Sequence, residues 1–346
     1  MGRILYGVMG DARGHVTRAL TVAQEMPEHE FLFLGGGKVH DLKSNGYNVE
    51  NIPMLSTFYR KNKVDIGSTL ANAFKVLLSS QKFKRRVIDI IRDFDPDQIL
   101  TDYEYFTPLA ARSQGRSCIS IDHQHILTHC NYQPPPSERV SRLLTCSTIK
   151  YLYSNCSKFF IVSFFNLIPK NHQNTVVLAP LIRKTVKMTK PSEGSHVLVY
   201  QTSPTFHNLF PVLEKIKSKF IIYGFGARPA RKNLVFKPPS TESFLEDLAS
   251  SRYAITNGGH NVLCEAMYLG KPVLAFPIEK AYEQFINSYF LTLCGYGSFS
   301  SSLNLSEQVF VDFEKHIDEF KKNIQTGNFL GNQELVRLLE GLMADQ

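Results

Sequence analysis

The sequence predicts an α/β protein made of two doubly wound, Rossmann-like domains that face each other across a cleft. Short apolar runs alternate with longer amphipathic stretches, a pattern typical of βαβ units and parallel sheets. The series occurs twice, on either side of a polar, basic stretch at 183–195. The length of 346 residues also suits two domains of roughly 100–200 residues each.

The first half of the chain is expected to open with a strand at 3–9 and a helix at 17–26. A glycine run, Gly35–Gly37, ends the next strand, and Pro134–Pro136 breaks the chain before a later helix. The further strands are expected at 30–34, 98–101, 117–121, 159–162 and 176–178, and the further helices at 68–94, 107–113 and 137–153.

The second half repeats the alternation. Its strands are expected at 196–200, 220–223, 233–236, 253–256 and 272–276, and its helices at 206–218, 241–250, 261–269, 281–293, 306–323 and 332–343. This order gives an N-terminal domain at 1–180, a linker at 181–194 and a C-terminal domain at 195–325. The last stretch, 326–346, is expected to be a C-terminal helix that can pack back on the N-terminal domain.

Charge and composition narrow the class of protein. The net charge of +8 suits an anionic partner such as a nucleotide, a phosphorylated substrate, a nucleic acid or an acidic lipid surface. No apolar run reaches the about 18 residues that a membrane-spanning helix needs, and the N-terminus lacks a signal-peptide pattern. The six cysteines form no C-x-x-C pair, so they are expected to be reduced, in a cytoplasmic protein.

A glycine-histidine loop, Gly10–His15, follows the first strand. Its glycines allow a ligand to approach the backbone, and the helix behind it favours negative charge. The spacing is not that of a dinucleotide fingerprint, and the second strand ends in glycines instead of an acidic residue, which disfavours NAD. His15 is either a general base or a helix-end histidine at the surface.

The strongest motif runs from Ala254 to Pro277 as strand, glycine turn, helix, glycine stop and strand. The amides of Asn257–His260 open the helix and can hold a diphosphate. Glu265 lies one to two turns into that helix. Its carboxylate either accepts two ribose hydroxyls or lies on a solvated helix face.

The run TNGGHNVLCEAMYLGKPVLAFPIEKAYEQFINSYFL resembles the nucleotide-sugar motif of the GT-B glycosyltransferases. It is most similar to the family 28 type, which includes the bacterial peptidoglycan N-acetylglucosaminyltransferase. The resemblance implies a donor site made of Arg183, Ser203, Thr205, Asn257, Gly258, Gly259, His260, Glu265, Glu283, Gln284 and Asn287. In it, Glu265 would hold the ribose and the glycine turn the diphosphate.

Three positions depart from the family pattern. Glu283 stands where a glutamine is common, which leaves the donor sugar open. One extra residue separates Pro180 from Arg183, and the segment around Ser203 and Thr205 offers hydroxyls in place of a glycine-rich loop.

The resemblance also implies an inverting mechanism, with His15 as the base. Asp102 or Asp122 would orient it, and the sequence does not choose between them. Gly14, His123 and His125 would form the acceptor side. The histidines at 123–129 could instead bind zinc or be ordinary loop residues, and Asp93–Asp97 ends a helix at the wrong sheet edge for a metal, so no metal or other cofactor is expected.

The preferred function is therefore transfer of a hexose or N-acetylhexosamine from a nucleoside-diphosphate sugar, with uridine as the expected nucleotide. The acceptor would be a cell-envelope glycan, a lipid or a secondary acceptor. A nucleotide-sugar epimerase and a non-catalytic nucleotide-sugar-binding module are the alternatives. The basic segments 58–63 and 82–86 are either solvated or a rim that meets anionic lipid on the inner face of the membrane, and nucleic acid is not an expected partner.

Overall fold

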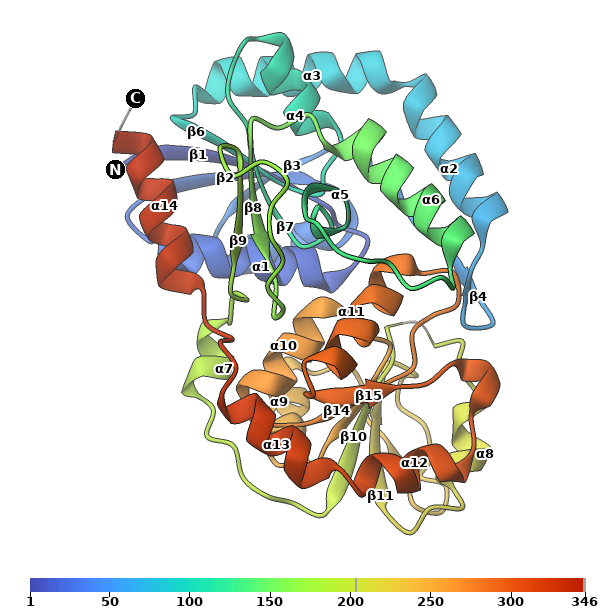
Figure 1. Cartoon of the computed structure of the whole chain (residues 1–346). Helices are drawn as coiled ribbons and strands as arrows, with labels where there is room; N and C mark the ends of the chain where they lie inside the picture. Colours follow the sequence, from blue (N-terminus) through green and yellow to red (C-terminus); the bar gives the residue numbers. More distant parts are fainter. Residues whose placement is uncertain (203, 345–346) are drawn as a thin grey trace. The chain divides into compact units, whose positions relative to one another are not determined.

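The chain divides into two compact units, which are described separately. The computed structural model describes residues 1–202 and 204–344 (Figure 1). Unit 1 consists of 1–58, 65–183 and the chain from Leu330 onward, and unit 2 of 59–64 and 184–329. These boundaries correct the expected ones. Residues 59–64, expected in the N-terminal domain, group with unit 2. So do 184–194, expected as part of the linker, and 326–329, expected with the C-terminal helix, whereas 181–183 of the expected linker group with unit 1.

Unit 1 is built on a seven-stranded parallel sheet of order β3-β2-β1-β6-β7-β8-β9. In that order the strands are Asn48–Asn51, Glu30–Gly35, Arg3–Val8, Gln98–Asp102, Ile119–Asp122, Lys158–Val162 and Thr175–Leu178. Helices α1 (Arg13–Glu25) and α14 (Asn332–Ala344) contact each other and share one apolar cluster with the sheet. Helices α3 (Ser80–Phe94) and α4 (Phe106–Ser113) join a second cluster. Apolar clusters on both sides explain why these strands are apolar throughout.

Unit 2 has a six-stranded parallel sheet of order β12-β11-β10-β13-β14-β15. In that order the strands are Leu234–Phe236, Lys219–Tyr223, His196–Tyr200, Ala254–Thr256, Val273–Ala275 and Gly297–Phe299. Its helices are α7 (Lys184–Met188), α8 (Leu209–Leu213), α9 (Thr241–Ala249), α10 (His260–Tyr268), α11 (Tyr282–Leu293), α12 (Glu307–Glu314) and α13 (Ile317–Gln325), with a short η3 (Ser302–Asn304). Apolar residues of the strands, α8 and α12 form one core.

Both sheets are doubly wound, as the sequence predicts. In each, the chain moves outward in one direction for three strands and then returns to the other side of the first strand. The direction reverses between β1 and β6 in unit 1, and between β10 and β13 in unit 2. Ligands of such sheets bind beyond the carboxyl ends of the strands at this point. The two reversal points therefore direct attention to the residues that follow these four strands.

Several expected helices are shorter than the sequence pattern indicates. The single helix expected at 68–94 is two, α2 (Ile66–Leu78) and α3, which meet at Ser79. The helix expected at 206–218 is only α8 (Leu209–Leu213); at and beyond its C-terminal end, the side-chain amide of Asn233 donates to the carbonyls of Leu213, Ile216 and Ser218. The helix expected at 306–323 is also two, α12 and α13.

The remaining elements of unit 1 lie in its connections. They are η1 (Gly37–Asn45), α5 (Ile126–His129), α6 (Arg139–Thr148) and η2 (Ile149–Tyr153), a π-turn that continues α6. The helix expected at 137–153 is thus α6 followed by η2. Within the described residues, no helix combines the length and the apolar character needed to cross a bilayer.

Strands β4 (Tyr59–Arg60) and β5 (Lys63–Val64) form a hairpin, which explains why residues 59–64 group with unit 2. Its turn residues Lys61 and Asn62 have φ of 51° and 55°, the left-handed conformation that a two-residue hairpin turn requires. The amide of Val64 donates to the carbonyl of Glu279 at 3.1 Å, and the amide of Glu279 to the carbonyl of Asn62 at 2.9 Å. The hairpin is therefore held to unit 2 by backbone hydrogen bonds.

Candidate functional site

His15 lies in the first turn of α1, directly after the glycine loop that follows β1. This loop packs closely against the glycine run after β2, since a Cβ on Gly10 would lie 1.8 Å from the carbonyl oxygen of Gly36. Only glycine fits there. The result is a histidine at a helix N-terminus, 8% exposed, at the reversal point of the unit 1 sheet.

Asp102, the last residue of β6, is hydrogen-bonded to His15. The distance from its Oδ1 to Nδ1 of His15 is 2.6 Å. Arg18 donates to both oxygens of the same carboxylate, from Nε at 2.7 Å and from Nη2 at 2.8 Å. Asp102 is fully buried and Arg18 is 4% exposed, so the two charges form a buried pair beside the imidazole.

This geometry fixes the state of the imidazole. The Asp102 charge raises the pKa of Arg18 above its ordinary value, although burial alone would lower it. Nδ1 of His15 lies 2.6 Å from Oδ1 of Asp102 and 3.1 Å from Nη2 of Arg18. Because a carboxylate can only accept and is the nearer partner, Nδ1 carries a proton and donates it to Asp102. The other ring nitrogen, Nε2, is then the one that can accept a proton. Asp102, rather than Asp122, is the carboxylate that orients His15.

Tyr103 stacks on the ring of His15. Its ring lies parallel to that of His15 at 5.9 Å between centroids, and stacks on Tyr153 at 3.9 Å. Tyr103 has a φ of 54°, a strained conformation for a tyrosine directly after a strand. Sequence reasoning missed both Arg18 and Tyr103. The spacing of Arg18, one helical turn after His15, was the available signal.

Asp122, at the end of β7, is paired with His125 instead. Its Oδ2 lies 2.6 Å from Nδ1 of His125, and Ser120 donates to the same oxygen. Burial would raise the pKa of Asp122, but the charge and hydrogen bonds of His125 lower it well below its usual range. Asp122 is therefore not hydrogen-bonded to His15, and the alternative in which it orients that base is corrected.

The expected acceptor-side histidines are buried. His123 and His125 are each 1% exposed, and Nδ1 of His123 donates to the carbonyl of Val162 at 2.8 Å. Gly14, beside His15, is partly exposed. In the loop after β7, Thr128 and His129 reach the surface where His123 and His125 do not. Among the described residues, a three-ligand grouping that could hold a metal occurs only at Glu28, His29 and Glu340, away from this loop in sequence.

In unit 2, Asn257 links the ends of β13 and β10 at the reversal point of the sheet by hydrogen bonds. It follows β13 and is fully buried, and its side-chain amide donates to Oε1 of Gln201, which follows β10. Its Oδ1 accepts from the amide of Thr202 at 2.6 Å. Asn257 thus positions the two loops that border the glycine turn. Gln201, which sequence reasoning missed, is its partner.

The glycine turn itself is tightly packed at one residue and open at the next. Gly258 has a φ of 80°, and a Cβ there would lie 2.4 Å from Oγ of Ser288 and 2.8 Å from the carbonyl oxygen of Gln284. Asn287, fully buried, donates to the carbonyl of Gly258 at 3.1 Å. A Cβ on Gly259 would meet nothing within 4 Å.

Gly259 is the N-cap residue of α10 and, as a glycine, makes no side-chain capping hydrogen bond. The first-turn amides of α10 are thus presented at an open glycine, which is the arrangement that binds anions at helix ends. His260 and Glu265, on the same helix, are each 6% exposed, and Nε2 of His260 lies 3.4 Å from Sγ of Cys264.

The other expected donor residues lie on different elements of the fold. Gln284 accepts from the amide of Ile278 at 3.0 Å, and Glu283 is partly exposed beside it on α11. Thr205 accepts from the amide of Asn62 in the β4–β5 hairpin at 2.8 Å, a contact that the sequence did not reveal. Arg183 closes the central stretch of unit 1 and is partly exposed. Ser203 lies outside the described residues.

Comparisons with known proteins agree with this architecture. A family model described as glycosyl transferase family 1 matches residues 2–318. An uncharacterized glycosyltransferase of Methanosarcina acetivorans is 25% identical over 367 residues, covering 98% of this chain and 93% of the relative.

Two solved structures share the fold. MurG of Acinetobacter baumannii is 16% identical with a TM-score of 0.64, covering 99% of this chain and all 100% of its own. The glycosyltransferase VinC in complex with DTDP is 13% identical with a TM-score of 0.61, at 99% and 100% coverage. The predicted resemblance to GT-B glycosyltransferases is confirmed, and so is the fold of two Rossmann-like domains. The chain belongs to glycosyl transferase family 1.

Proposed function

We propose that this glycosyltransferase moves a hexose or N-acetylhexosamine from a nucleoside-diphosphate sugar to an acceptor hydroxyl, with inversion at the anomeric carbon. The observation that carries the proposal is the buried network of His15, Asp102 and Arg18. A histidine held in one tautomer by a buried carboxylate is the arrangement of a general base.

The reaction follows from the state of that imidazole. Nε2 of His15 takes the proton of the acceptor hydroxyl while its oxygen attacks the anomeric carbon, and the bond to the diphosphate breaks. The imidazolium formed is stabilised by the Asp102 carboxylate, which Arg18 holds in place through two hydrogen bonds. The nucleoside diphosphate leaves with the electron pair of the broken bond. Arg183 is proposed to neutralise the leaving charge.

The donor is proposed to bind in unit 2. The N-terminus of α10, with Gly258, Gly259 and His260, would hold the diphosphate, and Glu265 the ribose. VinC was solved with a thymidine diphosphate, which supports a pyrimidine nucleoside diphosphate as the leaving group. Ser203, Thr205, Glu283 and Gln284 are proposed as further donor contacts. Asn257 and Asn287, both fully buried, would act as positioning residues for the turn.

The acceptor is proposed to be a glycan or lipid of the cell envelope, reached at an anionic membrane surface on its cytoplasmic face. Leu70, Phe74 and Leu78 recur at helical spacing along α2 and are 63%, 63% and 71% exposed. The basic run 82–86 follows on α3. An exposed apolar face beside basic residues is typical of helices that lie on anionic membranes.

The test is thermal unfolding with a panel of UDP, UDP-N-acetylglucosamine, UDP-glucose, UDP-galactose, GDP, dTDP and NAD, each with and without EDTA. A ligand at a hundred times its dissociation constant stabilises the folded state by about 2.7 kcal/mol. Selective stabilisation by uridine nucleotides, unchanged by EDTA, is expected. Stabilisation by NAD alone, or loss of the effect with EDTA, would contradict the proposed donor or its metal independence. Release of an epimerised sugar in the absence of acceptor would favour the epimerase instead.

A further inference from the structure

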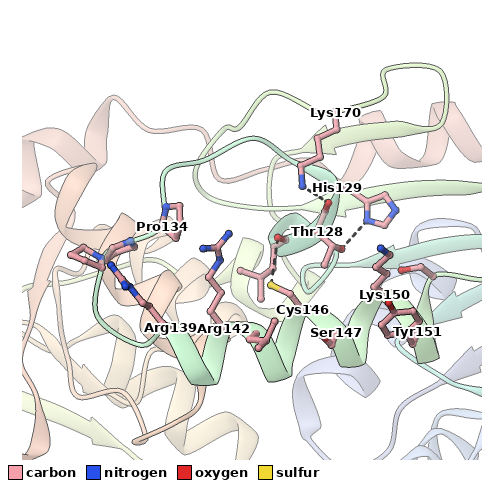
Figure 2. A pocket seen from close by; sticks show the side chains of 15 residues that line it. Thr128, His129, Pro134, Arg139, Arg142, Cys146, Ser147, Lys150, Tyr151 and Lys170 are labelled. Atoms are coloured by element: carbon pink, nitrogen blue, oxygen red, sulfur yellow. Dashed lines mark hydrogen bonds between the residues drawn. The ribbon is translucent and has the colours of Figure 1, made fainter.

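A cavity of about 1100 Å³ opens in unit 1, beside the loop that follows β7 (Figure 2). Its walls come from α5, from α6 with η2, from the proline run 134–136 and from the loop after β8. Figure 2 shows Arg142 on α6 and Lys170 on the loop after β8, with Thr128 and His129 beside Lys170. The proposed transfer reaction uses none of these lining residues, and of the sequence motifs only the histidine run 123–129 reaches the cavity, at His129.

The cavity carries positive charge without a counter-charge. Four cationic side chains line it, Arg139, Arg142, Lys150 and Lys170, and none of its lining residues is Asp or Glu. Lys170 donates to the carbonyl of Thr128 at 2.7 Å, which satisfies one of its three N–H bonds. A concave surface of one sign concentrates ions of the opposite sign, and two arginines add the planar forks that match phosphate oxygens.

The same cavity has an apolar side. Leu127, Leu143, Tyr151 and the three prolines line it, and Leu143 and Tyr151 are 68% and 72% exposed. Large apolar side chains that stay exposed beside a concave basic surface mark a ligand with an apolar part. The rigid proline wall adds apolar surface at little cost in conformational entropy.

The polar residues of α5 that line the cavity, Thr128 and His129, are uncharged at neutral pH. Burial, followed by the charges of His125 and Lys170, lowers the pKa of His129 to about 4. The ring of His129 therefore adds no further positive charge near neutrality, and its Nδ1 lies 3.0 Å from Oγ1 of Thr128. The four cations thus account for the charge of the cavity.

The cavity also belongs to the functional edge of the sheet. It lies beyond the carboxyl ends of β7 and β8, the edge at which His15 and Asp102 lie beyond β1 and β6. Its helical wall reaches the catalytic network through stacked rings, because Tyr153 of η2 stacks on Tyr103 and Tyr103 on His15. A ligand in the cavity would therefore contact η2, which is linked to the proposed base through the ring of Tyr103.

We propose that this cavity binds an anionic amphiphile, with a phosphate group on Arg139, Arg142, Lys150 and Lys170 and a hydrocarbon chain along Leu127, Leu143 and Tyr151. The proposal concerns binding alone. It holds whether or not the bound molecule is the sugar acceptor.

Titration calorimetry with three probes tests it: decyl phosphate below its micelle concentration, inorganic phosphate, and decanol. Decyl phosphate should bind at least tenfold more tightly than either of the others, because only it engages both sides of the cavity. Equal affinity for inorganic phosphate would show a site for free phosphate. Equal affinity for decanol would show an apolar groove. Either result overturns the proposal.

Variants locate the binding. Arg142→Glu and Lys150→Glu should each weaken decyl phosphate binding at least tenfold, and both side chains are exposed, so the fold should be retained. Lys43→Glu makes the same charge change at an exposed position of unit 1 outside the cavity and should leave binding unchanged. An equal loss in Lys43→Glu would mean that only net charge matters, which overturns the site.

Two further variants separate the apolar side of the cavity from other apolar surfaces. Leu143→Ser should reduce the affinity for decyl phosphate toward that for inorganic phosphate, which itself should not change. Phe74→Ser, on the exposed face of α2, should leave both affinities unchanged. Loss of decyl phosphate binding in Phe74→Ser alone would place the amphiphile on α2 and refute the cavity.

Discussion

The two reversal points have the same topology and opposite chemistry. In each unit a side chain beyond the first strand is hydrogen-bonded to one at the end of the fourth strand. In unit 1 the pair is His15 and Asp102, both ionisable, and the buried guanidinium of Arg18 donates to the same carboxylate. In unit 2 it is Gln201 and Asn257, two neutral amides.

The difference indicates a division of labour. A buried carboxylate paired with an arginine fixes the protonation of a neighbouring imidazole, which is what proton transfer requires. Neutral amides bring no charge of their own, so the turn they hold can present backbone N–H groups to an anion without competing for it. One Rossmann-like topology thus holds the proposed base in unit 1 and the proposed anion site in unit 2.

The largest effect is expected from removing the base. His15→Ala should lower the turnover about 10²–10⁴-fold, because general-base catalysis contributes that much, while donor affinity stays within about twofold. Initial rates of sugar transfer and donor titrations measure the two quantities. Full turnover in His15→Ala would remove the proton-transfer role from unit 1.

The choice between the two aspartates gives a matched control. Asp102→Asn removes the charge that fixes the His15 tautomer and should approach the loss seen in His15→Ala. Asp122→Asn, whose partner is His125, should change turnover by a few-fold at most in the folded protein. Equal losses in the two folded variants would contradict the assignment of Asp102.

A smaller effect is expected at the donor ribose. Glu265→Ala should weaken donor binding by ~1.5–3 kcal/mol, the worth of a hydrogen bond to a charged group, which corresponds to roughly 10–150-fold. Glu265→Gln retains one acceptor and should lose less. Calorimetric titration with UDP measures both. An unchanged affinity in Glu265→Ala would exclude the ribose contact.

The fold was predictable where the signal is local. Alternating apolar runs gave the order of strands and helices, and the glycine turns at Gly10 and Gly258 stood out because close packing leaves room for no side chain. Helix lengths were less predictable, since they depend on contacts such as that of Asn233, twenty residues further along the chain, with the carbonyl of Leu213 at the end of α8. The hairpin at 59–64 was missed because its backbone partner, Glu279, lies more than two hundred residues away.

The site shows the same limit. Sequence placed both Asp102 and Asp122 at strand ends but could not choose between them, because the choice depends on strand order. β6 lies next to β1, with Asp102 opposite Val8, whereas β7 is one strand further away. The burial of His123 and His125 was likewise beyond reach, because it arises from packing against β8 and the loop that follows it.

Two neighbouring glycines offer a finer test of the anion site. Gly258→Ala should destabilise the protein by about 1–2 kcal/mol or more, because it forces an alanine into a left-handed conformation against Ser288 and Gln284. Gly259→Ala meets nothing within 4 Å and should leave the melting temperature nearly unchanged. If the diphosphate lies against this turn, Gly259→Ala should still weaken UDP binding a few-fold. Unchanged binding in Gly259→Ala would place the diphosphate elsewhere.

The smallest expected effect concerns pH and distinguishes the units by their buried ionisable groups. His129 of unit 1 has a pKa lowered to about 4, below the ordinary value of 6.5, mainly by burial. In the unfolded chain His129 therefore binds a proton at higher pH than in the folded protein. Its contribution to the free energy of unfolding is fully present above about pH 6.5 and is lost as the pH drops toward 4.

His129→Gln should flatten this part of the stability curve by about 1 kcal/mol, the partly exposed ring being screened by solvent. His172→Gln, the same change at an exposed position of unit 1, should leave the slope unaltered. Denaturant unfolding at pH 4.5 and pH 7 measures the slopes. An identical pH dependence in wild type and His129→Gln would mean that this ring is not the group that makes unit 1 sensitive to mild acid.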